Sequence, residues 1–136
     1  MQLSILDSDI LSQLLKQRNP KVVASSSRYL QEHRQFAFSA LTRYEVVRGL
    51  KHRNAPAQLA RFNAFCEHSV VLPVTDLILE RAADLWAFGR HRGHAHRDAD
   101  LIIAATAIEN GRALVTANTS HFAWIPALVI EDWTKP

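Results

Sequence analysis

Short apolar runs alternate along the chain with longer segments in which apolar residues recur every three or four positions. The short runs predict strands, and the segments with helical periodicity predict helices. Strands are expected at 2–6, 36–39, 70–74, 113–116 and 128–130, and helices at 10–17, 21–33, 42–51, 77–90 and 99–110, with one more helix between Pro56 and Cys66. Because strands that alternate with helices pair in parallel, the expected fold class is α/β: a three-layer α/β/α sandwich with a central, mostly parallel sheet of about five strands.

Turn-forming residues separate these elements. Asn19-Pro20 and Asn54-Ala55-Pro56 interrupt the helical pattern, and Gly111 follows the last helix, where a left-handed backbone suits a helix end. The chain shows no internal repeat and no linker between domains. Its 136 residues are enough for one hydrophobic core, so we expect one domain over residues 1–136.

The composition is that of a soluble globular protein, with 48% hydrophobic and 21% charged residues. The first residues, MQLSIL, lack the basic segment of a signal peptide, and no apolar run approaches the roughly 20 residues that cross a bilayer. The single cysteine, Cys66, has no internal partner and is expected to pack in the core. We therefore expect a cytoplasmic protein that does not enter membranes.

Basic residues gather in two places, and the formal net charge is +3. The segment 90–97 holds three arginines and three histidines without an acidic residue, and a second group follows the second predicted strand. A positive surface suits contact with phosphate, although charge runs are usually just solvated. The candidate RNA-binding residues are Arg43, Arg48, Arg90, Arg92 and Arg97.

Four polar residues stand at or just after the ends of predicted strands. Asp7 ends the first strand, and Glu45 lies in the first turn of the helix after the second. Asp100 opens a later helix, and Asn118 follows the strand Ala-Leu-Val-Thr. In an open parallel sheet these positions lie at the carboxyl edge, where such folds bind their ligands. We therefore expect these four side chains to meet at one catalytic site.

Each acidic residue also has a purely structural explanation. Asp7 and Asp9 are suited to cap the first helix. The segment Thr42-Arg43-Tyr44-Glu45 fits the capping-box pattern, in which Glu45 only reaches back to the helix start. Asp98 and Asp100 both suit the positive end of the following helix.

Helical geometry separates the last two acids. At about 100° per residue, Asp100 shares a face with Ile103 and Ala107, whereas Asp98 projects toward the side of Glu109. A carboxylate on an apolar face is costly unless a cation lies nearby. Asp100 is therefore the preferred ligand, and Asp98 is assigned, together with Ser8 and Asp9, to the residues around the site.

A divalent cation is the expected partner of these acids. Two carboxylates about 4 Å apart repel each other by roughly 4 kcal/mol at intermediate dielectric, and no lysine occurs between Lys51 and Lys135 to balance them. A set of oxygen ligands favours Mg²⁺, with Mn²⁺ as a possible substitute, over zinc. The predicted metal ligands are Asp7, Glu45 and Asp100.

Several segments resemble one known family. The motif Leu6-Asp7-Ser-Asp-Ile10, the segment Ser39–Gly49 with Glu45, and the block Asp98–Phe122 are similar to PIN-domain toxins of the VapC type, as is the ending Val-Ile-Glu-Asp-Trp133. This resemblance covers nearly the whole chain. It implies a Mg²⁺-dependent endoribonuclease of a type II toxin–antitoxin system, a homodimer, a VapB-type antitoxin that blocks the site, and an RNA substrate, with structured RNA such as tRNA favoured over duplex DNA.

The chain departs from the family pattern at three positions. Asp9 stands where asparagine is common, and Asn118 and His121 stand where many relatives carry acids. We therefore expect one well-held metal, with a second only when a substrate phosphate adds ligands.

Three alternatives stay open. A PIN-like module that binds RNA or protein without cutting is favoured by the missing acid at Asn118. A phosphatase of the haloacid dehalogenase type is suggested by Asp7-Ser8-Asp9, but it needs a lysine that the chain lacks in the required region. A zinc site formed by His91, His94 and His96 has no strong signature.

Overall fold

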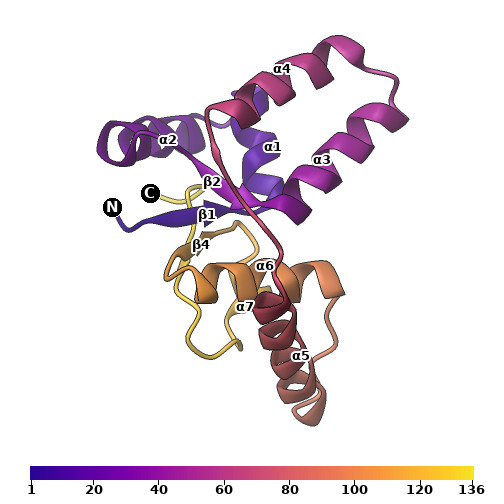
Figure 1. The fold of residues 1–136 in the computed structure, drawn as a ribbon. Coiled ribbons are helices and arrows are strands. Elements are labelled where there is room, and N and C mark those ends of the chain that lie inside the picture. Colours follow the sequence, from indigo (N-terminus) through magenta and orange to yellow (C-terminus); the bar gives the residue numbers. More distant parts are fainter.

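The computed structural model describes residues 1–136, which form five strands and seven helices (Figure 1). The strands are β1 (Ser4–Leu6), β2 (Ala37–Ser39), β3 (Val70–Leu72), β4 (Ala113–Val115) and β5 (Ile130–Glu131). The helices are α1 (Ser8–Lys16), α2 (Pro20–His33), α3 (Ala40–His52), α4 (Pro56–Glu67), α5 (Asp76–His91), α6 (Asp98–Glu109) and α7 (Thr119–Phe122). Each predicted element is present, and α7 is the one element that the sequence pattern did not predict. None of the helices combines the length and the apolar character needed to cross a membrane.

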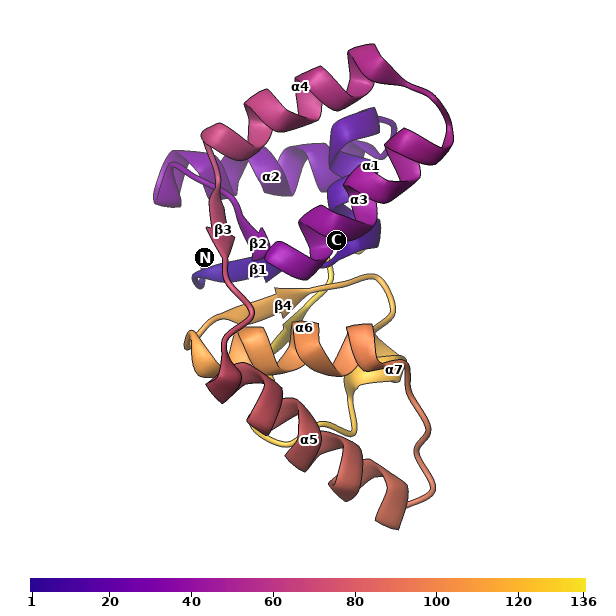
Figure 2. The same ribbon diagram turned by 45° about the vertical axis from the view of Figure 1, so that its right-hand side comes forward.

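All strand pairs are parallel, as predicted. Backbone hydrogen bonds join β1, β4 and β5 in one group, with β4 in the middle, and β2 and β3 in another. β2 lies beside β1, so the two groups meet there (Figures 1 and 2). The α/β fold is confirmed, but the expected continuous sheet of about five strands is wrong, since the largest hydrogen-bonded group has three.

A tyrosine explains why the two groups stay separate. On the side of β4, the Asp7 N–H donates to the Val115 carbonyl and the Leu3 carbonyl accepts from the Ala113 N–H. The backbone N–H of Ser4 instead donates to the hydroxyl of Tyr29 at 3.0 Å, and that hydroxyl donates to the Ser4 carbonyl at 3.3 Å. Tyr29 and Ser4 are both almost completely buried. A side chain thus takes the place of a strand partner at the start of β1.

Helices cover both faces of the strands. Neighbouring residues of a strand point to opposite faces, and the core divides accordingly: Ile5 and Leu114 pack with α5 and α6, whereas Leu6 and Val115 pack with α1, α2 and α4. Figure 2 shows the strands between these two helical layers. The three-layer arrangement leaves the carboxyl ends of the strands as the open edge. Cys66 is buried in the second cluster, as predicted.

Candidate active site

The carboxyl ends of β1 and β4 open onto a cavity of about 470 Å³. Its lining residues are Asp7, Ser8, Asp9, Glu45, Ala95, His96, Arg97, Asp100, Ile103, Asn118, His121 and Phe122. Asp7, Glu45, Asp100 and Asn118, which the sequence placed at one site, therefore face one cavity, together with Ser8 and Asp9. Asp98 does not line the cavity and is exposed. The cavity therefore brings together the other predicted residues but not Asp98.

Asp7 is buried at the end of β1, with 9% of its surface exposed. Its Oδ1 accepts a hydrogen bond from the Ile10 N–H at 2.8 Å and so caps α1. Burial raises the pKa of this carboxyl above its ordinary value, and the hydrogen bonds from Thr116 and Ile10 lower it only in part. The charges of Asp9 and Asp100 raise the pKa further. Asp7 is therefore both a helix cap and an acid that a nearby cation would hold in its charged form.

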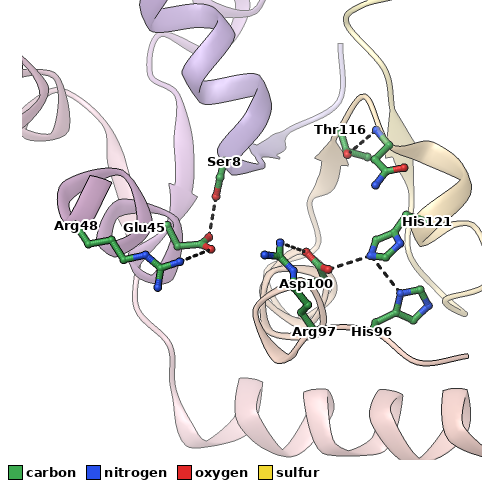
Figure 3. A network of polar contacts seen from close by, with 9 residues as sticks. Ser8, Glu45, Arg48, His96, Arg97, Asp100, Thr116 and His121 are labelled. Atoms are coloured by element: carbon green, nitrogen blue, oxygen red, sulfur yellow. Dashed lines mark hydrogen bonds and ion pairs between the residues drawn. The ribbon is translucent and has the colours of Figure 1, made fainter. Parts of the chain in front are cut away.

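Glu45 lies in the second turn of α3, one turn later than the sequence predicted, because α3 begins at Ala40. The capping-box explanation is wrong, since the cap is Ser39, whose hydroxyl oxygen accepts from the Leu41 N–H at 3.1 Å. Glu45 instead accepts a hydrogen bond from the hydroxyl of Ser8 at 2.8 Å and lies 3.8 Å from Arg48 (Figure 3). Its carboxylate is fixed at the cavity wall.

Asp100 lies in the first turn of α6, and only 14% of its side chain is exposed. The guanidinium of Arg97 lies 3.4 Å from Oδ1, and Nε2 of His121 lies 2.9 Å from Oδ2 (Figure 3). Arg97 is thus one positive group of the chain itself beside Asp100. Sequence reasoning noted His121 only as a departure from the family pattern, because its pairing with Asp100 depends on α7, which carries no periodic signal.

His96 contacts His121, the histidine that binds Asp100. Its Nδ1 lies 3.2 Å from Nε2 of His121, and its own Nε2 is buried without a partner. Burial, together with the nearby His121 and His94, lowers the pKa of His96 and so favours the neutral form of its ring. Asn118 is exposed at the start of α7, where its N–H donates to the Thr116 hydroxyl at 3.1 Å.

The candidate RNA-binding arginines divide into three groups. Arg97 lines the cavity, and Arg48 forms an ion pair with Glu45, which lines it. Arg90 and Arg92 lie outside it, over aromatic rings of α5. Arg43 is exposed on α3 and approaches the Cys66 thiol.

The chemistry of the cavity fits a hard divalent cation. Its donor atoms are mostly oxygens, from three aspartates, one glutamate, one asparagine and one serine. No three histidine, cysteine, aspartate or glutamate side chains are grouped closely enough to surround one ion. Mg²⁺ does not need such a cage, because it usually keeps several waters and takes one or two carboxylates from the protein. The predicted zinc alternative fits less well, since His91 does not line this cavity.

A fold of this kind with acids at the carboxyl edge is a PIN domain: the model of the PIN domain family matches residues 4–126, and the chain belongs to that family. Ribonuclease VapC1 of Haemophilus influenzae (strain R2866) is 28% identical over 134 residues, which are 96% of this chain and 98% of the relative. The resemblance to VapC-type proteins that the sequence indicated is thereby confirmed.

Solved structures extend the similarity to the whole fold. The DNA-bound VapBC of Salmonella typhimurium superposes with a TM-score of 0.86 at 25% identity, over 98% of this chain and 99% of that one. VapBC-1 of nontypeable Haemophilus influenzae gives a TM-score of 0.85 at 25% identity, with the same coverage of 98% and 99%.

Proposed function

We propose that this protein is a Mg²⁺-dependent endoribonuclease, the toxin of a type II toxin–antitoxin system, that acts in the cytoplasm. The observation that carries the proposal is the convergence of Asp7, Glu45 and Asp100, distant in sequence, on one cavity at the carboxyl edge of the strands. Membership of the PIN domain family and similarity to a protein named ribonuclease support the same reaction.

Asp7 and Asp100 are the proposed direct ligands of Mg²⁺, or of Mn²⁺ in its place. When bound, the metal lowers the pKa of a bound water and stabilises negative charge on the phosphoryl oxygens. Glu45, held by Ser8 at 2.8 Å, is on the opposite wall from Asp100 (Figure 3). This position suits it to contact the metal through water and to accept a proton from the attacking water at a carboxylate oxygen.

The remaining cavity residues orient these groups and the substrate. His121, 2.9 Å from Oδ2, restricts the rotation of the Asp100 carboxylate. Asn118 and Arg97 are exposed and line the cavity, so both can contact the phosphate or its water, Arg97 while it lies beside Asp100. Attack by water in line with the leaving oxygen then breaks the P–O bond, and the leaving oxygen takes up a proton from solvent.

The proposed partners are a VapB-type antitoxin and a second copy of the chain. Both Salmonella and Haemophilus structures are of VapBC. The proposed substrate is a structured RNA such as tRNA, since sequence-specific recognition of RNA mostly uses single-stranded loops and bulges rather than a duplex. RNA sequencing of cut ends after brief induced expression identifies the target.

Cleavage of RNA in Mg²⁺ by wild type, Asp100→Asn and Asp98→Asn tests the enzymatic assignment. Loss of a group that only supports a metal ligand typically lowers activity by roughly 10- to 100-fold. We expect Asp100→Asn to lower the cleavage rate by more than this, because it removes a ligand itself. Asp98→Asn is the matched control, because Asp98 lies on the same turn but faces solvent. Equal rates for wild type and Asp100→Asn refute the assigned role.

Two alternatives make different predictions. A non-catalytic PIN-like module, which the asparagine at position 118 favours, binds RNA but leaves it intact even with saturating Mn²⁺. A phosphatase of the haloacid dehalogenase type needs a lysine at the site, and no lysine lines the cavity. Turnover of a small phosphate ester and not of RNA is the result that favours it.

A further inference from the structure

A stack of flat side chains lies beside the cavity, where two histidines of the segment that joins α5 to α6 pack on Trp124, which follows α7. The ring of His94 lies on the indole of Trp124 with centroids 4.9 Å and planes 10° apart, and the ring of His96 lies on it at 4.8 Å and 10°. The two imidazole centroids are 6.0 Å apart. Rings on opposite faces of the indole would be nearly twice as far apart as either is from it, so the imidazoles lie side by side on one face.

The backbone holds His94 in this position. Gly93 has a φ of +78° and follows the end of α5. The Gly93 N–H donates to the Arg90 carbonyl at 3.2 Å, and the His94 N–H donates to the Gly89 carbonyl at 2.8 Å. This pair of bonds is a Schellman closure, which glycine favours because it adopts positive φ without strain. These bonds at the end of α5 therefore fix the position of the His94 backbone.

Packing fixes the indole beneath His94. The Nε1–H of Trp124 donates to the His121 carbonyl at 3.0 Å. Its ring also lies against Gly89, where an added Cβ would come within 2.8 Å of the indole. The indole that supports His94 is therefore held by a hydrogen bond on one side and by close packing against α5 on another.

The surroundings of the stack are positively charged and open. The guanidinium of Arg92 lies 3.6 Å from the centre of the Phe88 ring, and Phe88 stacks on Trp124 in turn. Arg92 has no acidic partner within ion-pair distance and is exposed. His94 is exposed as well, whereas His96 forms part of the cavity wall. An exposed ring thus stands two positions before a ring that lines the cavity.

We propose that His94 is a stacking site for one unpaired nucleobase of the RNA, next to the nucleotide whose phosphate enters the cavity. The inference rests on the proposed function for its substrate. Unpaired bases stack on aromatic side chains, including histidine, whereas paired bases inside a duplex are covered on both faces. Arginines around the stack attract the phosphates of any RNA without distinguishing paired from unpaired segments. His94 therefore directs the enzyme to loops, bulges and single strands.

Binding of two RNA probes separates stacking from charge. One probe is a fluorescein-labelled single strand of about 12 nucleotides, and the other is an abasic chain with the same number of phosphates. Both are titrated by fluorescence anisotropy in Mg²⁺, with every variant built on Asp100→Asn to limit cleavage. We expect His94→Ala to lower affinity for the strand with bases by about 5- to 150-fold and to leave the abasic chain unaffected.

Two further variants complete the test. His94→Phe keeps a flat ring and should retain tight binding of the strand with bases. His91→Ala removes an exposed histidine that stacks on no ring, and it should change neither affinity. The proposal is overturned if His94→Ala weakens both probes equally, if it weakens neither, or if neither probe binds at all. Thermal unfolding of each variant checks that the fold is intact.

The proposed function is tested separately by cleavage with the unmodified protein. If RNA is bound in a His94-dependent way but never cut, the enzymatic assignment fails and the stacking site stands. If RNA is cut and His94→Ala behaves as wild type on both probes, only the stacking site fails.

Discussion

Asp7 serves the fold and the cavity at the same time. Its carboxylate caps α1, yet its burial raises its pKa above the value of an exposed aspartate. The folded state therefore binds a proton at Asp7 more readily than the unfolded state does. The stability that this group contributes is complete below its unfolded pKa and is lost as the pH rises through the higher, folded pKa. At neutral pH a cation in the cavity offsets this loss.

Asp7→Asn should stabilise the protein at pH 7 in the presence of a chelator and abolish RNA cleavage. Asparagine keeps an oxygen that caps α1 but carries no charge to bury. We expect the melting temperature to rise by a few degrees at pH 7, and the difference from wild type to disappear as the pH falls below the ordinary pKa of aspartate. Calorimetry across this pH range measures the two effects on the melting temperature, and an RNA cleavage assay in Mg²⁺ measures the loss of activity. A lower melting temperature for the variant at pH 7 would show that the charged carboxylate stabilises the fold.

At the scale of the element, the start of α3 decides where Glu45 lies. The hydroxyl of Ser39 caps the helix, and the helix therefore begins at Ala40, two residues before its predicted start at Thr42. Thr42 is completely buried, and its hydroxyl has no hydrogen-bond partner. Because a buried hydroxyl without a partner loses its hydration and gains nothing, Thr42 weakens the fold at this point.

Thr42→Val should therefore stabilise the protein by about 1 kcal/mol, since valine has nearly the same shape and no hydroxyl to bury. Ser39→Ala should destabilise it by about 1 kcal/mol through loss of the cap. Urea unfolding measures both changes. If Thr42 were the cap, as the capping-box pattern suggested, Thr42→Val would be the destabilising change.

At the scale of the whole molecule, Tyr29 lies where the two strand groups meet, since it binds Ser4 of β1 and packs on Phe36, which precedes β2. The group that contains β1 and β4 provides Asp7 after β1, Asn118 after β4, and Asp100 from α6, the helix before β4. Glu45 comes from α3, which follows β2 in the other group. The cavity therefore forms only if the groups keep their relative position. The hydroxyl of Tyr29 binds both backbone groups of Ser4 at this junction.

Tyr29→Phe should destabilise the protein by about 1–3 kcal/mol, because it leaves the buried N–H of Ser4 without a partner. Amide hydrogen exchange at β1 should become faster than in wild type. Tyr44→Phe is the matched control, because Tyr44 is 56% exposed and its loss of a hydroxyl costs little. An unfolding free energy equal to that of the control would mean that water or a neighbouring group replaces the Tyr29 hydroxyl.

Much of this architecture is determined by the sequence itself. Apolar periodicity depends only on which faces of an element are buried, so it located the five strands and six of the seven helices. Gly111 was correctly placed at the end of α6, where its φ is +62°. The acids could be assigned to one edge because parallel strands place their carboxyl ends together, and Asp100 could be distinguished from Asp98 by helical geometry alone.

Other features were decided only by tertiary structure, because they depend on contacts between residues far apart in the chain. Tyr29 separates the strand groups by binding Ser4, 25 residues away. His121 reaches Asp100 across 21 residues from a helix of four residues that is too short to show a period. His94 lies on Trp124 because a helix end and an indole meet in space. The local sequence pattern determines which residues are buried, whereas the tertiary structure determines which side chains contact each other.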